Sequence, residues 1–149
     1  MIDFMILQTF SQILLSAALG MAIGAEREHR HKSAGLRTYT LVAIGSALFT
    51  ILSLYGFSGT EAKGFDPSRI ASQVVVGIGF IGTGIVILRE NKIEGLTTAA
   101  GLWVTAAVGM AVGLGFYLIA IFTTILILAV FVALTHLKKE ILFKDENKI

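Results

Sequence analysis

The chain contains no cysteine and only one proline among its 149 residues. Without cysteine it can form neither a disulfide nor a thiolate metal site, and it has no cysteine nucleophile. Charged residues are also scarce, at 15% of the chain, whereas an ordinary soluble domain has about 25%. A soluble domain needs a polar shell, and these few charges fall in short clusters. The composition therefore excludes a soluble globular enzyme and a nucleic-acid-binding module.

Long apolar runs take the place of the missing charge. Hydrophobic residues make up 55% of the chain, and the mean hydropathy is +0.82. A membrane helix needs about 20 apolar residues, and the sequence offers runs over Phe4–Ala25, Tyr39–Phe57, Ile70–Leu88 and Leu96–Leu137. The last run is long enough for two spans, and Gly113–Gly115 allows a turn within it. We therefore predict an all-α integral membrane protein with a bundle of about five transmembrane helices.

The distribution of Lys and Arg predicts the orientation of this bundle. With five spans, segments 26–38, 89–95 and 138–149 share one side and hold all but two of the 12 basic residues. The other side has only Lys63 and Arg69. By the positive-inside rule the N-terminus lies outside and the C-terminus in the cytoplasm. The same rule explains the net charge of +2 without a nucleic-acid partner.

Local signals define the domain and two helix starts. We expect a transmembrane domain over residues 1–137 and a short basic cytoplasmic tail over 138–149, with no C-terminal soluble domain. Asp66 followed by Pro67 is typical of an N-cap and a first helical residue. Gly95 is a helix breaker, and Thr97 and Thr98 after it predict hydroxyl caps for the next helix.

Sixteen glycines indicate how the helices pack, because small residues let membrane helices approach closely. Two spans carry a polar-to-small stripe at a spacing of three or four residues: Gln8, Gln12, Ser16, Gly20 and Gly24 in the first, and Thr98, Gly101, Thr105, Gly109 and Gly113 in the fourth. The third span has glycines on two faces, at Gly77, Gly79, Gly82 and Gly84. We therefore place the third span centrally and the glycine-free fifth span at the periphery, facing lipid. Packing contacts are the favoured interpretation of these glycines, and thin points in a conformational element or ligand path are the alternative.

Two glycine patterns point beyond simple packing. Gly77–Gly82 matches the dinucleotide pattern G-x-G-x-x-G, but that pattern requires a preceding strand. Here it lies within an apolar span, so no nucleotide or other cofactor is expected. The pairs Gly20/Gly24 and Gly109/Gly113 have the close-approach spacing, and they predict a homodimer or another homo-oligomer if either helix has a spare face. The competing interpretation is that both pairs are used within one chain.

Ionisable and polar residues near the span ends are the candidate binding residues. Glu26, Arg27, Arg37, Arg89 and Glu90 lie near Thr97 and Thr98 on the predicted cytoplasmic side. Snorkelling to the interface is the simpler explanation, and the alternative is a polar cluster that ties helices together and receives a partner or an ion. On the other side, Asp66 can pair with Arg69, and Gln73 lies one turn deeper, where its amide needs a hydrogen-bond partner.

The sequence contains no evident catalytic or metal site. No carboxylate lies at bilayer depth, whereas Mg²⁺ is usually bound through carboxylate oxygens. His29 and His31 stand among four Lys and Arg residues, which oppose cation binding. The histidines also form no set with a nucleophile and an orienting group, so we expect neither a catalytic residue nor a bound metal.

Five segments together resemble the membrane domain of the MgtC/SapB family. They are Gly24–Arg27, Ala34–Thr38, Asp66–Gln73, Gly77–Gly84 and Gly95–Trp103, and their order and spacing agree with the family over residues 1 to about 137. On this resemblance, Trp103 joins the candidate residues named above. Many members continue into a further cytoplasmic domain.

The resemblance implies a multi-pass protein of a bacterial or archaeal cytoplasmic membrane that is linked to growth under Mg²⁺ limitation. The best-known members are associated with virulence through survival in macrophages, and restraint of the proton-driven ATP synthase is their usual proposed mechanism. We therefore expect a non-enzymatic regulator that contacts the lipid bilayer and a membrane-protein partner. The alternative is a transporter or channel for Mg²⁺ or another small ion that works as an oligomer.

Overall fold

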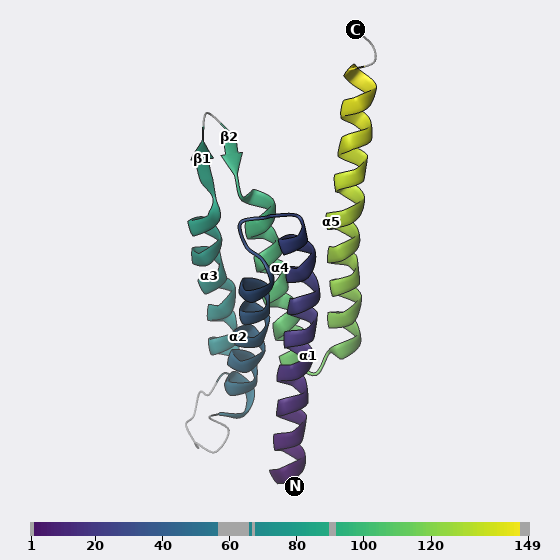
Figure 1. Ribbon diagram of the computed structural model, residues 1–149. Helices are drawn as coiled ribbons and strands as arrows, with labels where there is room; N and C mark the ends of the chain where they lie inside the picture. Colours follow the sequence, from purple (N-terminus) through teal and green to yellow (C-terminus); the bar gives the residue numbers. More distant parts are fainter. Residues whose placement is uncertain (1, 57–65, 67, 90–91, 147–149) are drawn as a thin grey trace.

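The computed structural model describes residues 2–56, 66, 68–89 and 92–146 (Figure 1). This part contains five helices and one two-stranded hairpin: α1 Ile2–His29, α2 Leu36–Tyr55, α3 Ser68–Ile85, β1 Ile87–Arg89, β2 Lys92–Glu94, α4 Leu96–Gly113 and α5 Tyr117–Glu146. The predicted break in the long apolar run is confirmed. Gly115 has a φ of +83°, a left-handed conformation that favours glycine, and it separates α4 from α5.

The helices alternate in direction, so the two termini lie at opposite ends of the bundle (Figure 1). Helices α1 to α4 are each long and apolar enough to cross a membrane. In α5, Tyr117–Ala133 forms a shorter apolar segment. The helix continues to Glu146, through the segment expected to be a tail. We call the end that holds the α1–α2 turn and the hairpin the basic end, because residues 26–38, 89 and 92–95 lie there.

Helix α4 occupies the centre of the bundle, where the sequence had placed α3. Helix α4 packs against all four other helices, with Leu102, Val108 and Val112 almost fully buried. On α3, by contrast, Ile78 and Gly82 are the buried residues. A Cβ atom added at Gly77, Gly79 or Gly84 would meet nothing within 4 Å. The prediction of a central α3 is therefore wrong, because glycines that thin both faces of a helix permit close neighbours without requiring them. Helix α5 lies at the edge of the bundle (Figure 1), as predicted.

The stripes on α1 and α4 both pack against α2. A Cβ at Gly20 would lie 2.7 Å from Ala43 Cβ, and one at Gly113 would lie 2.8 Å from the Ala47 carbonyl oxygen. Gly24 and Gly109 meet α2 backbone just as closely. The interpretation that both glycine pairs act within one chain is confirmed, and the expected spare face is absent at these residues. In the α1 stripe Gln8 is exposed, and burial begins at Gln12.

Buried polar side chains in the bundle find backbone partners. Gln12 Nε2 donates to the carbonyl oxygens of Val112 at 3.0 Å and Gly113 at 3.2 Å. These carbonyls belong to the last turn of α4, where helices leave acceptors without an internal partner. The amide of Gln12 therefore satisfies this helix end and joins α1 to α4 in the apolar interior.

The third helix is shorter than predicted. It ends at Ile85, and residues of the expected span form strand β1, in which Ile87 pairs with Glu94 of β2. Gly95 then adopts a φ of +89°, and a Cβ there would collide with the Ile85 carbonyl oxygen. Gly95 is the N-cap of α4, which has no side-chain cap, so the prediction of hydroxyl caps from Thr97 and Thr98 is wrong.

Candidate functional site

A buried charge cluster lies at the basic end, in the last turns of α1. Arg27 is 4% exposed, and its Cζ atom lies 4.2 Å from the centroid of the Phe131 ring in α5. Its Nη1 atom lies 3.6 Å from Glu26 Oε2, while Arg30 Nε lies 3.4 Å from Glu26 Oε1. The guanidinium is therefore held by a cation–π contact and an ion pair, and does not extend toward solvent. Snorkelling is the wrong explanation for Arg27.

Tyr39 and Thr98 extend this cluster to α2 and α4. The Tyr39 hydroxyl donates to the Thr98 carbonyl oxygen at 3.3 Å. A Cβ at Gly101 would lie 2.6 Å from Tyr39 Oη and 2.8 Å from Phe131 Cζ, so this glycine provides the space in which the two rings fit. Tyr39 is fully buried, so its ring lies inside the bundle and not on the surface. We call Glu26, Arg27, Tyr39, Thr98 and Phe131 the Arg27 cluster; its residues come from four helices.

The Arg27 cluster contains polar atoms without hydrogen bonds. Among the described residues, both carboxylate oxygens of Glu26 and the Nε atom of Arg27 are buried and have no hydrogen-bond partner. Removing two charges from water costs several kcal/mol per ion, and attraction offsets that cost only when the remaining donors and acceptors are satisfied. Stability alone is therefore a poor explanation for the cluster. The cluster therefore retains hydrogen-bonding capacity at buried atoms that no described residue uses.

The other candidate residues at the basic end lie outside the Arg27 cluster. Arg37, the second residue of α2, and Arg89, on β1, are both exposed. Thr97, in the first turn of α4, is exposed as well, whereas its neighbour Thr98 is buried. The structure therefore brings together three of the predicted residues, Glu26, Arg27 and Thr98. Glu90 lies outside the described residues.

Helix α3 borders an apolar groove on one side and an apolar slot on the other. The first, which we call the α2–α3 groove, has a volume of about 610 Å³ and is lined by Arg37, Thr38, Leu41, Val42, Gly45, Ser46, Phe49, Ile70, Gln73, Val74, Gly77, Ile78 and Ile81. The slot between α3 and α4 measures about 300 Å³, and the exposed Trp103 lines it. Helix α3, which these two grooves flank, is the least buried of the four candidate spans α1 to α4.

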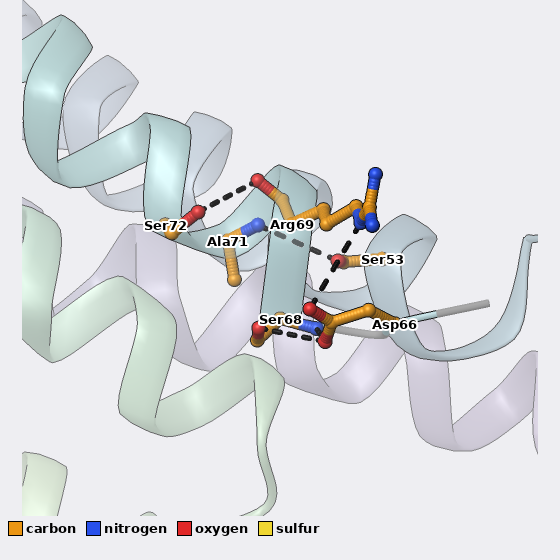
Figure 2. Close-up of polar contacts among 6 residues, drawn as sticks. All are labelled: Ser53, Asp66, Ser68, Arg69, Ala71 and Ser72. Atoms are coloured by element: carbon orange, nitrogen blue, oxygen red, sulfur yellow. Dashed lines mark hydrogen bonds and ion pairs between the residues drawn. The ribbon is translucent and has the colours of Figure 1, made fainter. Parts of the chain in front are cut away.

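At the opposite end, Asp66 caps α3 as predicted (Figure 2). Its Oδ1 atom accepts hydrogen bonds from the Ser68 hydroxyl at 2.7 Å and the Ser68 amide at 2.9 Å. These two bonds hold the pKa of the Asp66 carboxyl below its usual range. Arg69 Nε lies 3.9 Å from Asp66 Oδ2, which confirms the predicted pair. Both side chains are exposed, so this end is a helix cap and not a buried site.

Two more hydrogen bonds lie in the same region, one between α3 and α2 and one within α3. The Ala71 amide donates to Ser53 Oγ of α2 at 3.4 Å, and the Ser72 hydroxyl donates to the Arg69 carbonyl oxygen at 2.8 Å (Figure 2). Gln73 is exposed at the far end of the α2–α3 groove. Asp66, Arg69 and Gln73 are thus far along the bundle from the Arg27 cluster.

Sequence reasoning missed Tyr39 and Phe131 as members of a site. Phe131 stands in a run of Ile, Leu, Val and Ala residues, and no local pattern distinguishes it from lipid-facing neighbours. Only tertiary packing places its ring over Arg27. Over the residues that the structure describes, no group of three or more His, Cys, Asp or Glu side chains converges as a metal site would require.

Comparison with known proteins identifies relatives of the chain. The model of the MgtC family matches residues 13–140. YhiD of Escherichia coli K12, named provisionally as a magnesium transporter, is 52% identical over 83% of this chain and 60% of its own length. Protein MgtC of Brucella abortus is 46% identical over 75% of this chain and 45% of its own length. Protein MgtC of Salmonella typhimurium is 43% identical over 78% of this chain and 48% of its own length.

The chain spans about half the length of these curated relatives, from 45% to 60%. No solved structure matches it. The matched segment includes every residue of the Arg27 cluster and both walls of the α2–α3 groove. The comparisons therefore apply to the helical bundle itself.

Proposed function

Because the chain belongs to the MgtC family, we propose that it is a non-enzymatic regulator in a bacterial cytoplasmic membrane that acts on another membrane protein when Mg²⁺ is limiting. The proton-driven ATP synthase is the candidate target that the family resemblance suggests. In this proposal α5 also crosses the membrane, the N-terminus lies outside, and the basic end faces the cytoplasm.

The Arg27 cluster is the observation that supports a regulator most strongly. Three side-chain atoms of Glu26 and Arg27 are buried and make no hydrogen bond within the described residues. A partner that supplies a donor to Glu26 would complete the cluster. Charge-assisted hydrogen bonds of this kind are about twice as strong as neutral ones. The exposed Thr97 lies next to Thr98 of the cluster, so a partner bound at this end would also contact Thr97.

Site-specific photo-crosslinking in native membranes tests this proposal. A photoreactive amino acid at Thr97 should give a discrete adduct with one membrane protein. The same amino acid at Ile119, which is exposed near the start of α5 at the opposite end, should not. The adduct at Thr97 should be lost in the Arg27→Gln variant if the folded amount is unchanged. Equal crosslinking at both positions, or adducts only with a second copy of this chain, would contradict a regulator that acts through the basic end.

Ion transport by an oligomer is the second candidate function, supported by the provisional name of YhiD. Mg²⁺ gives up its waters reluctantly and is usually bound through carboxylates. The described part of the bundle brings no three acidic or His side chains together. We therefore expect the purified chain in liposomes to conduct no Mg²⁺. Saturable Mg²⁺ flux without another protein would favour the transporter over the regulator.

A further inference from the structure

The α2–α3 groove is an apolar depression that runs along the side of the bundle, and no described side chain fills it. The two helices run antiparallel (Figure 1), so Arg37 and Ile81 lie at its basic end and Phe49 and Ile70 at the other. Its walls are thin at Gly45 and Gly77, where a Cβ would meet nothing within 4 Å. An apolar groove on the side of a membrane-spanning bundle is open to the acyl chains of the bilayer.

The narrow space between α2 and α3 favours a single acyl chain over a helix. Arg37 and Phe49 are twelve residues apart on α2, which is about 18 Å of helix. Helices α2 and α3 contact each other, so a third helix with a diameter of about 10 Å cannot enter between them. A partner helix could therefore only lie over the groove and insert side chains, whereas one acyl chain could enter it along its whole length.

Charge at one end of the groove favours an anionic occupant. Arg37 is an exposed cation at the basic end, and the described lining contains no acidic side chain. The carboxylate of Glu28 lies at the start of α2, close to Arg37 in the sequence. Its Oε2 atom accepts the Leu36 amide at 2.8 Å, and Glu28 is not part of the lining. A phosphate at the Arg37 guanidinium would leave the chain beneath it in line with the apolar walls.

We propose that the α2–α3 groove binds one anionic phospholipid, with an acyl chain between Gly45 and Gly77 and the phosphate at Arg37. The inference does not depend on the proposed regulatory function. It agrees with the predicted orientation, since the cytoplasmic leaflet carries the anionic lipids. Thr38, which also lines this end of the groove, offers a hydroxyl to the same phosphate.

Lipid photolabelling of the full chain in vesicles tests the proposal. The probe is phosphatidylglycerol with a diazirine in the middle of one acyl chain, in vesicles of phosphatidylethanolamine and phosphatidylglycerol. A phosphatidylethanolamine probe with the same acyl chain provides the comparison. Mass spectrometry of the labelled peptides should place the adducts of the anionic probe on α2 between Leu41 and Phe49 and on α3 between Val74 and Ile81. The zwitterionic probe should label these segments less.

Matched variants separate the groove from ordinary lipid contact. Arg37→Gln should lower anionic labelling of the groove by about fivefold, the contribution of one basic residue near anionic lipid, whereas Arg89→Gln removes an exposed cation of the hairpin and should change nothing. Gly77→Leu should fill the groove and abolish labelling. Gly79→Leu adds the same side chain at another open glycine, outside the groove. This variant should leave the labelling of the groove unchanged. Gly45→Leu fills the groove from the other wall if the Gly77 variant fails to fold.

Two results would overturn the proposal. Labelling that is as strong at exposed positions such as Phe80 and Leu118, with no preference for the anionic probe, would mean ordinary boundary lipid only. Crosslinks from a photoreactive residue at Leu41 to a polypeptide in native membranes, in place of lipid, would mean that a partner helix covers the groove.

Discussion

Replacing Gly20 by Ala tests how closely the backbones of α1 and α2 approach. The added Cβ would lie 2.7 Å from Ala43 Cβ and 2.8 Å from the Tyr39 carbonyl oxygen. Carbon atoms in favourable contact lie about 3.5–4.0 Å apart. The two helices would have to separate locally by about 1 Å, because both neighbouring atoms are backbone or attached directly to it and cannot rotate away.

The cost of this separation follows from packing energetics. Inserting one methyl group into a tight core costs about 1–3 kcal/mol, and a gap of 0.5–1 Å forfeits a quarter to a half of each dispersion contact along the interface. Alanine also stabilises a helix by about 1 kcal/mol over glycine. We therefore expect a net loss of about 1–2 kcal/mol, roughly five- to thirtyfold in the ratio of folded to unfolded protein.

Reversible unfolding in mixed detergent micelles, followed by circular dichroism, measures this loss. Gly79→Ala is the matched control, because its Cβ would meet nothing within 4 Å. The control should be neutral or more stable by up to about 1 kcal/mol. If the Gly20 variant is as stable as the Gly79 variant, the α1–α2 interface does not depend on close backbone approach, and the packing argument is refuted.

Three further predictions concern the charged groups and the topology. Arg27→Met should lower the free energy of unfolding by about 2–4 kcal/mol, because the buried carboxylate of Glu26 then has Arg30 as its remaining ion-pair partner in the described structure. Arg69→Met removes one member of the exposed Asp66–Arg69 pair and should cost under about 1 kcal/mol in the same assay. Because the pKa of Asp66 is lowered, its cap stabilises the protein fully above the ordinary carboxyl pKa, and this stabilisation is lost as the pH falls through the lowered pKa. NMR should therefore show the first turn of α3 fraying below about pH 4. An equal response in the Asp66→Asn variant would reject this cause. Reporter fusions after Ser58 and after Lys144 should report opposite sides of the membrane, and signals from the same side would exclude five spans.

The sequence predicts the helices of this fold because apolar length and helix breakers are local properties. The runs of about 20 apolar residues and the break at Gly113–Gly115 depend on nothing beyond their own segments, and the structure confirms them. The order of helices in the bundle is not local. Gly77 and Gly109 look alike in sequence, yet one faces open space and the other faces α2 backbone. Which glycine is covered depends on the partner helix, and that information lies elsewhere in the chain.

The same distinction explains how far the candidate site was predictable. Glu26 and Arg27 attract notice because charges beside an apolar span are costly, and Thr98 because its hydroxyl recurs in a stripe. Their burial beneath Phe131 requires α5 to return past the end of α1, and no residue in α5 signals that return. A polar residue near a span end can thus be identified from sequence, but whether it snorkels or is enclosed depends on the neighbouring helix.

The contrast between tight and loose interfaces has a consequence for how the two proposed sites can communicate. Helices α1, α2 and α4 meet backbone to backbone at Gly20, Gly24 and Gly113, so they resist displacement as separate units. Helix α3 has few buried residues and leads into the hairpin, so an occupant of the α2–α3 groove acts first on α3. A lipid that shifts α3 moves Arg89 relative to the exposed surface around Thr97. Thermodynamic linkage then makes the effect reciprocal: bound lipid changes the affinity of the protein for a partner at the basic end by the same factor as the bound partner changes its affinity for the lipid. If α3 stays fixed when the groove fills, lipid photolabelling and partner crosslinking are independent, and Gly77→Leu abolishes the first without changing the second.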